Sequence, residues 1–282
     1  MGKTAAMAFD PYEPYGPVVE TTVRVAMWNI WGRYGDWPAR QAAIESELQR
    51  EDPDIVCLVE AWEADGVTAA DVLGDTLALP GRVQVGSWEA GGFTSGVALL
   101  SRWPIAASES RELSGGETGN VGSALFARVE GPRGDLQFFV VSLDYPLDAS
   151  ALRQAQVREL AAFVREVTRG RHPTVVCGDF NAHPDSDEIR MLTGRSATPE
   201  PGLVFYDAWE VAGDGGAGIT WSNTNPLAAI GRIPDRRFDY IFSAWPRLSA
   251  VGHPVACRLM GVEPVNGAYA SDHYGVVADL RY

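Results

Sequence analysis

The sequence is short of cysteine, histidine and positive charge. Its 282 residues include three Cys and four His, and 23 Lys and Arg stand against 37 Asp and Glu. The cysteines (Cys57, Cys177 and Cys257) are odd in number and far apart, and the first two sit inside apolar runs. We therefore expect buried, reduced thiols. The lack of Cys/His spacing also argues against structural zinc.

A formal net charge of −14 follows from this composition. It argues against tight non-specific binding to nucleic acid or anionic lipid, because such binding relies on cationic contacts. A polyanionic substrate stays compatible with the charge, since bound divalent cations supply the missing positive charge.

Residues 1–20 contain one Lys and no sustained apolar run. They fit neither a signal peptide nor a transmembrane helix, so a cytoplasmic protein without stable membrane association is expected, unless a leader has been lost. The segment is rich in Pro and Tyr, and we expect it to be irregular. Residues 21–282 show no internal repeat or linker and predict a single domain, since α/β domains commonly exceed ~200 residues. We expect a monomer.

Apolar runs typical of strands alternate along the chain with stretches in which apolar residues recur at the spacing of a helix. The predicted strands are 22–28, 55–59, 83–88, 96–101, 123–129, 136–143, 174–177, 238–242 and 276–280. The predicted helices are 37–50, 67–79, 150–168 and 186–193.

One strand end carries a pair of polar side chains suited to chemistry. The run 174–177 stops at Gly178 and is followed by Asp179 and Asn181. Alternation along an extended chain places these two side chains on the same side, with Phe180 turned the other way. A carboxylate beside an amide can hold a hard cation or an attacking water, but strand-end Asp and Asn also form ordinary turns. The residues at the ends of the other predicted strands decide between a functional site and an ordinary turn.

Similar polar residues lie at the end or edge of other apolar runs. Catalytic groups and ligands in α/β folds gather where strand ends meet loops. Carboxylates and amides that converge there favour a divalent cation, and the absence of Cys/His spacing favours an ion with oxygen ligands, Mg²⁺ or Mn²⁺, over structural zinc. The residues are Asn29, Glu60, Asp179, Asn181, Asp239, Asp272 and His273.

Six segments together resemble the endonuclease/exonuclease/phosphatase superfamily, the DNase I-like metal-dependent phosphoesterases. They occur in the family's order and span roughly residue 22 to the C-terminus. The resemblance implies an α/β fold built as a four-layer sandwich, two mixed sheets face to face with helices outside. The segments are Met27–Ile30, Leu58–Glu60, Leu99–Ile105, Gly178–Ala182, Arg237–Phe242 and Ser271–Val276.

The resemblance also implies a role for each matching residue. Glu60 would be the principal metal carboxylate, with Asn29 and Asp272 near it, and Asp179 would position or deprotonate the attacking water. Asn181 would orient the phosphate or a second metal. His273, held by Asp239, would stabilise the developing charge on the phosphate. A metal and an imidazolium suit this chemistry, because phosphoryl transfer needs mainly positioning and charge neutralisation.

One position departs from the family pattern. Many members carry a second histidine in a Thr-His-Leu-Asp arrangement, whereas this chain reads Val141-Ser142-Leu143-Asp144-Tyr145. A serine hydroxyl donates one hydrogen bond but is no general acid near neutral pH. Tyr145 would then substitute for the histidine, or the metal would activate the leaving oxygen directly.

Several residues have two interpretations in the sequence. His183 is either a metal or phosphate contact or a solvated loop residue, and Trp221 either stacks on a base or sugar or packs. Trp31, Tyr34 and Trp37 form either an aromatic rim or part of the core. Arg232, Arg236 and Arg237 either clamp a phosphate or form ion pairs.

The sequence thus predicts a divalent-metal-dependent phosphodiesterase, with nucleic acid as the first choice of substrate. A phosphatase or a phospholipase C-like hydrolase of a phosphorylated small molecule or lipid head group is the alternative. A binding protein that keeps the fold but has weakened catalysis is an alternative of another class, supported by Ser142.

Overall fold

Two mixed β-sheets form the centre of the molecule in the computed structural model, which describes residues 21–115, 121–169, 172–245 and 250–282. The predicted irregular segment 1–20 lies outside these residues. Within them, the first sheet contains seven strands in the order β12-β13-β1-β2-β5-β4, with β3 paired to β2. Its strands are β1 (Thr22–Asn29), β2 (Ile55–Ala64), β3 (Val67–Thr68), β4 (Gly81–Ala90), β5 (Phe93–Ser101), β12 (Pro254–Met260) and β13 (Gly275–Arg281).

The second sheet contains six strands, again counted within the described residues, in the order β10-β11-β9-β8-β7-β6. Each sheet has one parallel pair, β1 with β2 and β8 with β9. The strands are β6 (Ile105–Gly115), β7 (Val121–Gly131), β8 (Gly134–Ser142), β9 (Thr174–Asp179), β10 (Phe205–Asp207) and β11 (Asp239–Ala244).

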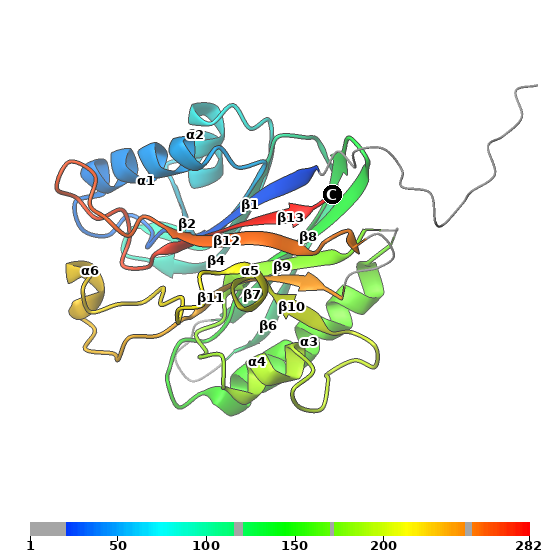
Figure 1. Ribbon diagram of the computed structural model, residues 1–282. Coiled ribbons are helices and arrows are strands. Elements are labelled where there is room, and N and C mark those ends of the chain that lie inside the picture. Colours follow the sequence, from blue (N-terminus) through cyan, green and yellow to red (C-terminus); the bar gives the residue numbers. More distant parts are fainter. Residues whose placement is uncertain (1–20, 116–120, 170–171, 246–249) are drawn as a thin grey trace, which may run out of the picture.

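Helices α1 to α4 cover the outer faces of the two sheets (Figure 1). Apolar residues of α1 and α2 pack on the first sheet, and those of α3 and α4 pack on the second. Because both sheets are covered on both faces, their central strands are apolar on both sides. The helices are α1 (Trp37–Glu51), α2 (Ala69–Thr76), α3 (Ser150–Val167), α4 (Asp187–Leu192), α5 (Ala208–Ala212) and α6 (Pro226–Ala229).

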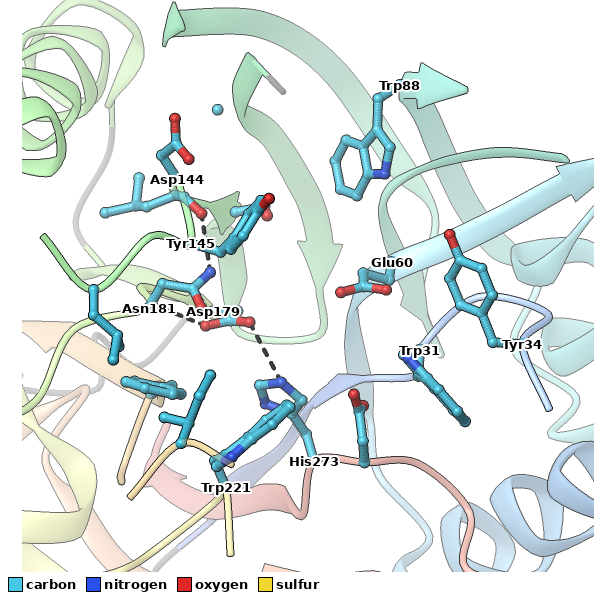
Figure 2. Close-up of a pocket in the computed structure, with 17 residues that line it drawn as sticks. Trp31, Tyr34, Glu60, Trp88, Asp144, Tyr145, Asp179, Asn181, Trp221 and His273 are labelled. Atoms are coloured by element: carbon cyan, nitrogen blue, oxygen red, sulfur yellow. Dashed lines mark hydrogen bonds and ion pairs between the residues drawn. The ribbon is translucent and has the colours of Figure 1, made fainter. Parts of the chain in front are cut away.

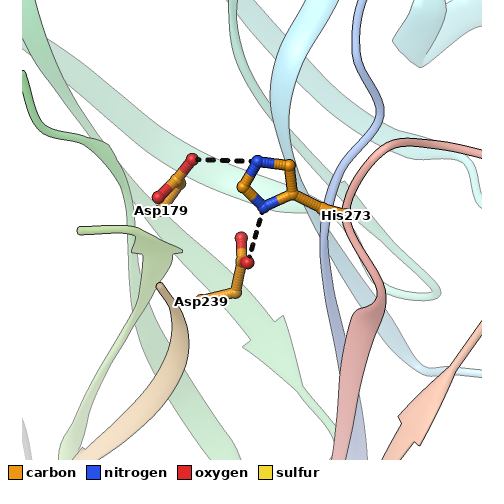
Figure 3. Close-up of side chains that lie close together, drawn as sticks. All are labelled: Asp179, Asp239 and His273. Carbon is orange, nitrogen blue, oxygen red and sulfur yellow. Dashed lines mark hydrogen bonds and ion pairs between the residues drawn. The ribbon is translucent and has the colours of Figure 1, made fainter. Parts of the chain in front are cut away.

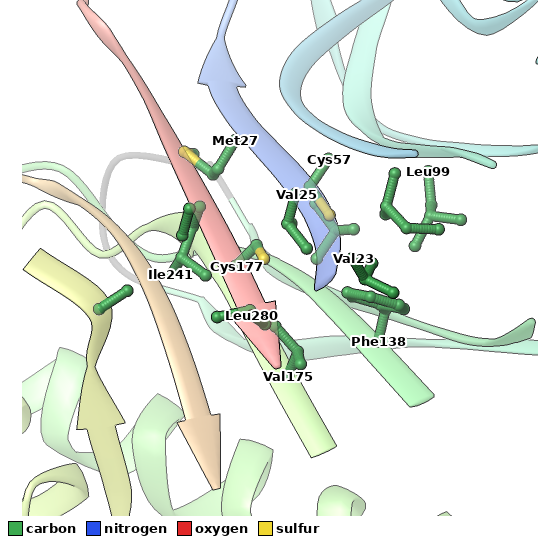
Figure 4. Packing of buried hydrophobic residues seen from close by; sticks show 14 of the residues in the cluster. Val23, Val25, Met27, Cys57, Leu99, Phe138, Val175, Cys177, Ile241 and Leu280 are labelled. Atoms are coloured by element: carbon green, nitrogen blue, oxygen red, sulfur yellow. The ribbon is translucent and has the colours of Figure 1, made fainter. Parts of the chain in front are cut away.

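The main core lies between the sheets (Figure 4). Strand alternation explains its composition: Val25 and Met27 of β1 face this core, while Trp28 packs under the outer helices. Cys57 and Cys177 meet there, and these two cysteines and Cys257 are buried and free of disulfides, as expected. The predicted four-layer α/β sandwich is confirmed.

Two βαβ units set the position of the strand ends that matter here. In one, β1 leads through α1 to the parallel strand β2, and in the other β8 leads through α3 to β9. The β8–β9 contact is so close that a Cβ at Gly178 would lie 2.0 Å from the carbonyl oxygen of Val141. Only glycine permits this approach, which aligns Ser142 with Asp179.

Some predicted boundaries were wrong. β2 continues to Ala64 instead of ending before Glu60, because a β-bulge between Val59 and Ala61 lets pairing with β5 resume. The predicted helix 67–79 begins only at Ala69, after the short strand β3. Strands β6 and β12 were not predicted: β6 is mostly exposed, and β12 begins at a proline.

Candidate active site

A cavity of about 300 Å³ opens where the strand ends of the two sheets meet (Figure 2). Six of the eight predicted site residues line it: Ser142, Glu60, Asp179, Asn181, Asp272 and His273. The other two, Asn29 and Asp239, are buried and hydrogen-bond to residues of the lining. The fold therefore brings the whole predicted set together. Ser142 and His273 line the same cavity, as the family resemblance requires.

Asn29 connects the two sheets at the floor of the cavity. Its Nδ2 donates to Glu60 Oε1 at 3.1 Å and to Asp179 Oδ2 at 3.0 Å. Its Oδ1 accepts from the backbone N–H of Trp31 at 3.0 Å. The amide nitrogen therefore faces the carboxylates, and the amide oxygen is engaged in the loop. In this geometry Asn29 orients both acids.

Three non-glycine residues of the cavity lining adopt left-handed backbone conformations. They are Trp31 with φ 54°, Glu60 with φ 53° and Asn181 with φ 49°. Such conformations cost free energy for residues with a Cβ and concentrate at functional sites. At Glu60 the bulge turns the carboxylate out of the strand's alternation and into the cavity.

Asn181 reaches the site in a different way from the one its spacing predicts. The strand ends at Asp179, so simple alternation does not extend to Asn181. Instead, the backbone N–H of Asn181 donates to Asp179 Oδ1 at 2.9 Å, and its Nδ2 donates to the carbonyl oxygen of Leu143 at 3.0 Å. Asn181 thereby ties the end of β9 to the end of β8.

His273 lies between two carboxylates (Figure 3). Its Nδ1 is 2.8 Å from Asp239 Oδ2, and its Nε2 is 3.8 Å from Asp179 Oδ2. The indole of Trp221 meets the ring edge-on at 5.0 Å between centroids. The ring is thus held on three sides within the described residues.

Burial and mutual repulsion make the acids of the site hard to ionise without a cation. Burial, followed by the charge of Asp239, raises the pKa of Asp179 to about 7. Burial, followed by the charge of Glu60, raises the pKa of Asp272 to about 6, and burial also raises the pKa of Glu60. Burial alone would lower the pKa of His273, but the carboxylates of Asp239 and Asp179 raise it well above its ordinary value.

The donor set fits a divalent cation. The acidic residues in the lining are Glu60, Asp144, Asp179 and Asp272, and no described residue of the lining is Lys or Arg. Carboxylates packed this closely are stabilised by a hard cation with oxygen ligands. The buried group Asp179, Asp239 and His273 could also bind a metal, since it offers three ligand atoms within 4.8 Å of one another.

The structure shows where several of the side chains with two interpretations lie. Trp31, Tyr34 and Trp221 line the cavity, whereas Trp37, the first residue of α1, is buried in the core between the outer helices and the first sheet. Tyr145, 54% exposed, stands on the opposite wall with Leu147. Trp88 and Asp144 also line the cavity and were missed by the sequence analysis.

The remaining candidates form ion pairs or lie away from the lining. His183 Nδ1 is 2.7 Å from Asp185 Oδ1 on the surface. Arg237 is buried against Asp207, with 2.5 Å between Nη1 and Oδ2. Arg232 and Arg236 are not among the residues that line the cavity.

A two-sheet sandwich with acids, amides and an Asp–His pair at its strand ends defines a class, the metal-dependent phosphoesterases. The family model described as "Endonuclease/Exonuclease/phosphatase family" matches residues 27–273. The chain belongs to this family, and it is a phosphoester hydrolase. A search of curated proteins found no match.

Solved structures share the fold. An endonuclease/exonuclease/phosphatase from Beutenbergia cavernae is 24% identical with a TM-score of 0.67, over 92% of this chain and 71% of that one. D. rerio TDP2 complexed with a single-strand DNA product is 20% identical with a TM-score of 0.71, over 93% and 100%. The human Nocturnin catalytic domain with bound sulfate is 22% identical with a TM-score of 0.68, over 92% and 93%. No helix in the described part of this chain is long and apolar enough to span a membrane.

Proposed function

We propose that this chain is a divalent-metal-dependent phosphodiesterase that cleaves nucleic acid by attack of an activated water on phosphorus. The network that joins Glu60, Asn29, Asp179, His273 and Asp239 at the floor of one cavity carries the proposal. In this proposal Glu60 would bind the metal, Asp179 would act as the base, and the protonated ring of His273 would contact the phosphate in the cavity.

Glu60 and Asp272 are the residues that would hold Mg²⁺ or Mn²⁺. Both carboxylates line the cavity, and the charge of Glu60 opposes ionisation of Asp272 until a cation is present. Asp179 and Asn181 are the candidates for a second ion. When bound, the metal supplies Lewis-acid polarisation of the phosphate oxygens. Asn29 keeps Glu60 and Asp179 apart in fixed orientations through its two N–H donors.

Asp179 is the general base of the proposal. A pKa of about 7 matches a group that must accept a proton from water near neutral pH. The hydrogen bonds from Asn29 and the Asn181 backbone fix both carboxylate oxygens. Asn181 also contributes to the wall where the phosphate would lie.

His273 is the electrostatic partner of the phosphate. Asp239 fixes the ring through Nδ1 and favours the protonated form, which leaves Nε2–H directed into the site. A fixed imidazolium there stabilises the negative charge that develops on phosphoryl oxygens in the transition state.

Ser142 would face the leaving group, since it pairs with Asp179 at the end of β8 and lines the cavity. Its hydroxyl can donate a hydrogen bond but cannot deliver a proton as an acid near neutral pH. Tyr145 lines the cavity as well and offers a second hydroxyl.

The cavity suits a short or single-stranded nucleic acid better than a long duplex. Trp31, Tyr34 and Trp88 offer faces on which a base can stack, and stacking is the usual route to single-stranded recognition. D. rerio TDP2, which shares the fold, was solved in complex with a single-strand DNA product. The lack of Lys and Arg among the described lining residues favours the second candidate, a phosphorylated small molecule or a lipid head group. Only Ser142 supports a binding protein with weakened catalysis.

A substrate panel tests the proposal. The protein is incubated with Mg²⁺ or Mn²⁺ and plasmid DNA, single-stranded RNA, sphingomyelin, bis-p-nitrophenyl phosphate or p-nitrophenyl phosphate. We expect diesters to be cleaved, single-stranded nucleic acid among them, and chelation to abolish the reaction. Asp179→Asn should lower kcat about 10²–10⁴-fold, whereas Asp185→Asn, in the exposed ion pair with His183, should not.

Two outcomes would count against the function. Exclusive cleavage of the monoester or of sphingomyelin would transfer the proposal to the second candidate. If no substrate is turned over, and Glu60→Ala leaves metal-dependent thermal stability unchanged, the hydrolase proposal fails.

A further inference from the structure

Two buried arginines occupy matching places in the two βαβ units. Arg40 lies in α1 and follows Asn29, the last residue of β1, by eleven positions. Arg153 lies in α3 and follows Ser142, the last residue of β8, by eleven positions. Their exposures are 2% and 3%. From their contacts we infer that they are positioning residues, each of which fixes one wall of the active-site cavity independently of the other.

Arg40 holds the wall formed by residues 30–34, which carries Trp31 and Tyr34. Its Nη1 donates to the carbonyl oxygens of Tyr34 at 2.6 Å and of Trp31 and Gly32 at 3.3 Å, and its Nη2 donates to that of Ile30. The guanidinium also stacks on the indole of Trp31 at 4.7 Å. One side chain thus donates to four of the five carbonyl oxygens of residues 30–34.

The same guanidinium reaches the segment that carries Asp272 and His273. Its Nε donates to the carbonyl oxygen of Ala270 at 3.0 Å. The next residue, Ser271, donates from its hydroxyl to the carbonyl oxygen of Asn29 at 2.7 Å. Arg40 therefore sets the distance between the two chain segments that carry Asn29 and Asp272, on the side of the cavity that would hold the metal.

Arg153 holds the opposite wall, residues 144–147, which carries Tyr145 and Leu147. Its Nη1 donates to the carbonyl oxygens of Asp144 at 3.1 Å and of Pro146 at 2.6 Å. Its Nε donates to Glu188 Oε1 of α4 at 2.7 Å, and this carboxylate is fully buried. These contacts lie on the substrate-facing wall, away from Glu60 and Asp272, so Arg153 acts on that wall.

Arginine suits both places because of its donor count and shape. A guanidinium offers five N–H donors in a planar fork, whereas a lysine ammonium offers three on one atom. Lysine keeps the positive charge but cannot span carbonyls on both sides of a loop. Arg→Lys at these two places therefore removes the positioning while keeping the charge.

The two walls make distinct predictions for the same substitution. This inference rests on the proposed function for its metal readout. Two quantities are measured for the Arg40→Lys and Arg153→Lys variants. Mn²⁺ binding is measured by calorimetry without substrate, and kcat and KM are measured with bis-p-nitrophenyl phosphate. Arg50→Lys, on the exposed side of α1, is the control. Arg40→Lys should weaken Mn²⁺ binding about 10–100-fold, as loss of an outer partner of a metal ligand does. Arg153→Lys should weaken Mn²⁺ binding much less than Arg40→Lys does, each compared with the Arg50→Lys control, and should raise KM.

Hydrogen exchange supplies a readout that needs neither metal nor activity. Arg40→Lys should speed amide exchange in residues 30–34, and Arg153→Lys in residues 144–147, each by roughly tenfold or more, because the lost donors no longer hold the loop closed. If Arg40→Lys does not fold, Trp37→Leu removes the second ring that flanks Arg40, 5.6 Å away, and should loosen the same loop less strongly.

The outcomes separate the two proposals. Absence of Mn²⁺ binding in the wild type would refute the proposed function, while exchange confined to the predicted loops would still support the role of the arginines. Exchange unchanged in both loops, or equal loss of Mn²⁺ binding in both variants, would overturn the inference.

Discussion

Ser142 determines how the leaving group departs in the proposed reaction. It stands beside Asp179 at the end of β8 and is 9% exposed. A hydroxyl at this place provides a hydrogen bond without a transferable proton near neutral pH. The enzyme should therefore depend strongly on the leaving group's own acidity.

Replacement of Ser142 by histidine tests this dependence. Ser142→His should raise kcat for alkoxide leaving groups, such as those of nucleic acid, by up to about 10²-fold, because a general acid becomes available. It should change little for p-nitrophenolate, which leaves without a proton. The measurement is kcat for a series of diesters of graded leaving-group pKa. An identical slope in both proteins would mean that position 142 plays no part in departure.

Most residues of the candidate site could be predicted from the sequence, because each lies at one end of an apolar strand and in the order typical of one family. Asp239 and His273 illustrate this: the family resemblance implies that Asp239 holds the ring of His273, and in the structure the two side chains lie 2.8 Å apart. Trp88 and Asp144 could not be predicted in the same way. Trp88 lies within a strand pattern, and Asp144 belongs to a loop whose path Arg153 sets.

At the scale of elements, the bulge in β2 is the feature that the sequence hid. An apolar run followed by Glu60 reads as a strand end, yet pairing with β5 continues on both sides of it. The information lies in the register of two strands distant in sequence, so no local pattern reveals it. The same holds for β6 and β12, whose sequences lack a clear alternation but pair with β7 and β13.

The left-handed conformation of Glu60 predicts a difference between two inactive variants. Glu60→Ala and Glu60→Gly should both lose activity, since both remove the carboxylate. Glu60→Gly should be more stable by about 1 kcal/mol, because φ 53° strains alanine and not glycine. Urea unfolding of both metal-free variants measures this. Equal stability, or a more stable alanine variant, would argue that the bulge relaxes once the carboxylate is gone.

For the whole molecule, the buried acids connect stability to pH. Burial, aided by neighbouring charge, raises the pKa values of Asp179 and Asp272 to about 7 and about 6, and carboxylates raise that of His273. In the unfolded chain these groups return to ~3.9 for Asp and ~6.5 for His. The folded chain therefore binds more protons than the unfolded chain between these values.

Metal-free protein should accordingly become less stable as pH rises from about 4 to about 8, since stability falls with pH wherever the native state binds more protons. Exposed acids with lowered pKa values, such as Asp185 and Asp235, change charge below this interval. Chemical unfolding in a chelator across this range measures the trend, and Mn²⁺ should reverse the loss at the alkaline end. A free energy of unfolding that rises with pH in the chelator would contradict the site's electrostatics.

The architecture itself was predictable at this scale because the family resemblance covers most of the chain, while the acidic net charge of −14 left the substrate open. Charge and composition describe the whole surface, whereas a substrate is selected by the few side chains around one cavity. The pairing of two βαβ units, with an arginine at the same place in each, emerged only from the assembled fold.

The Mn²⁺ dependence of bis-p-nitrophenyl phosphate hydrolysis by the wild type and by Glu60→Gln tests the central claim most directly. Glu60→Gln keeps the shape of the side chain but removes the charge that would hold the cation. We predict that hydrolysis by the wild type saturates with Mn²⁺ and vanishes in a chelator. The Glu60→Gln variant should need at least roughly tenfold more Mn²⁺ than the wild type to reach half its maximal rate. Undiminished hydrolysis in the chelator, or the same Mn²⁺ dependence in both proteins, would contradict the account.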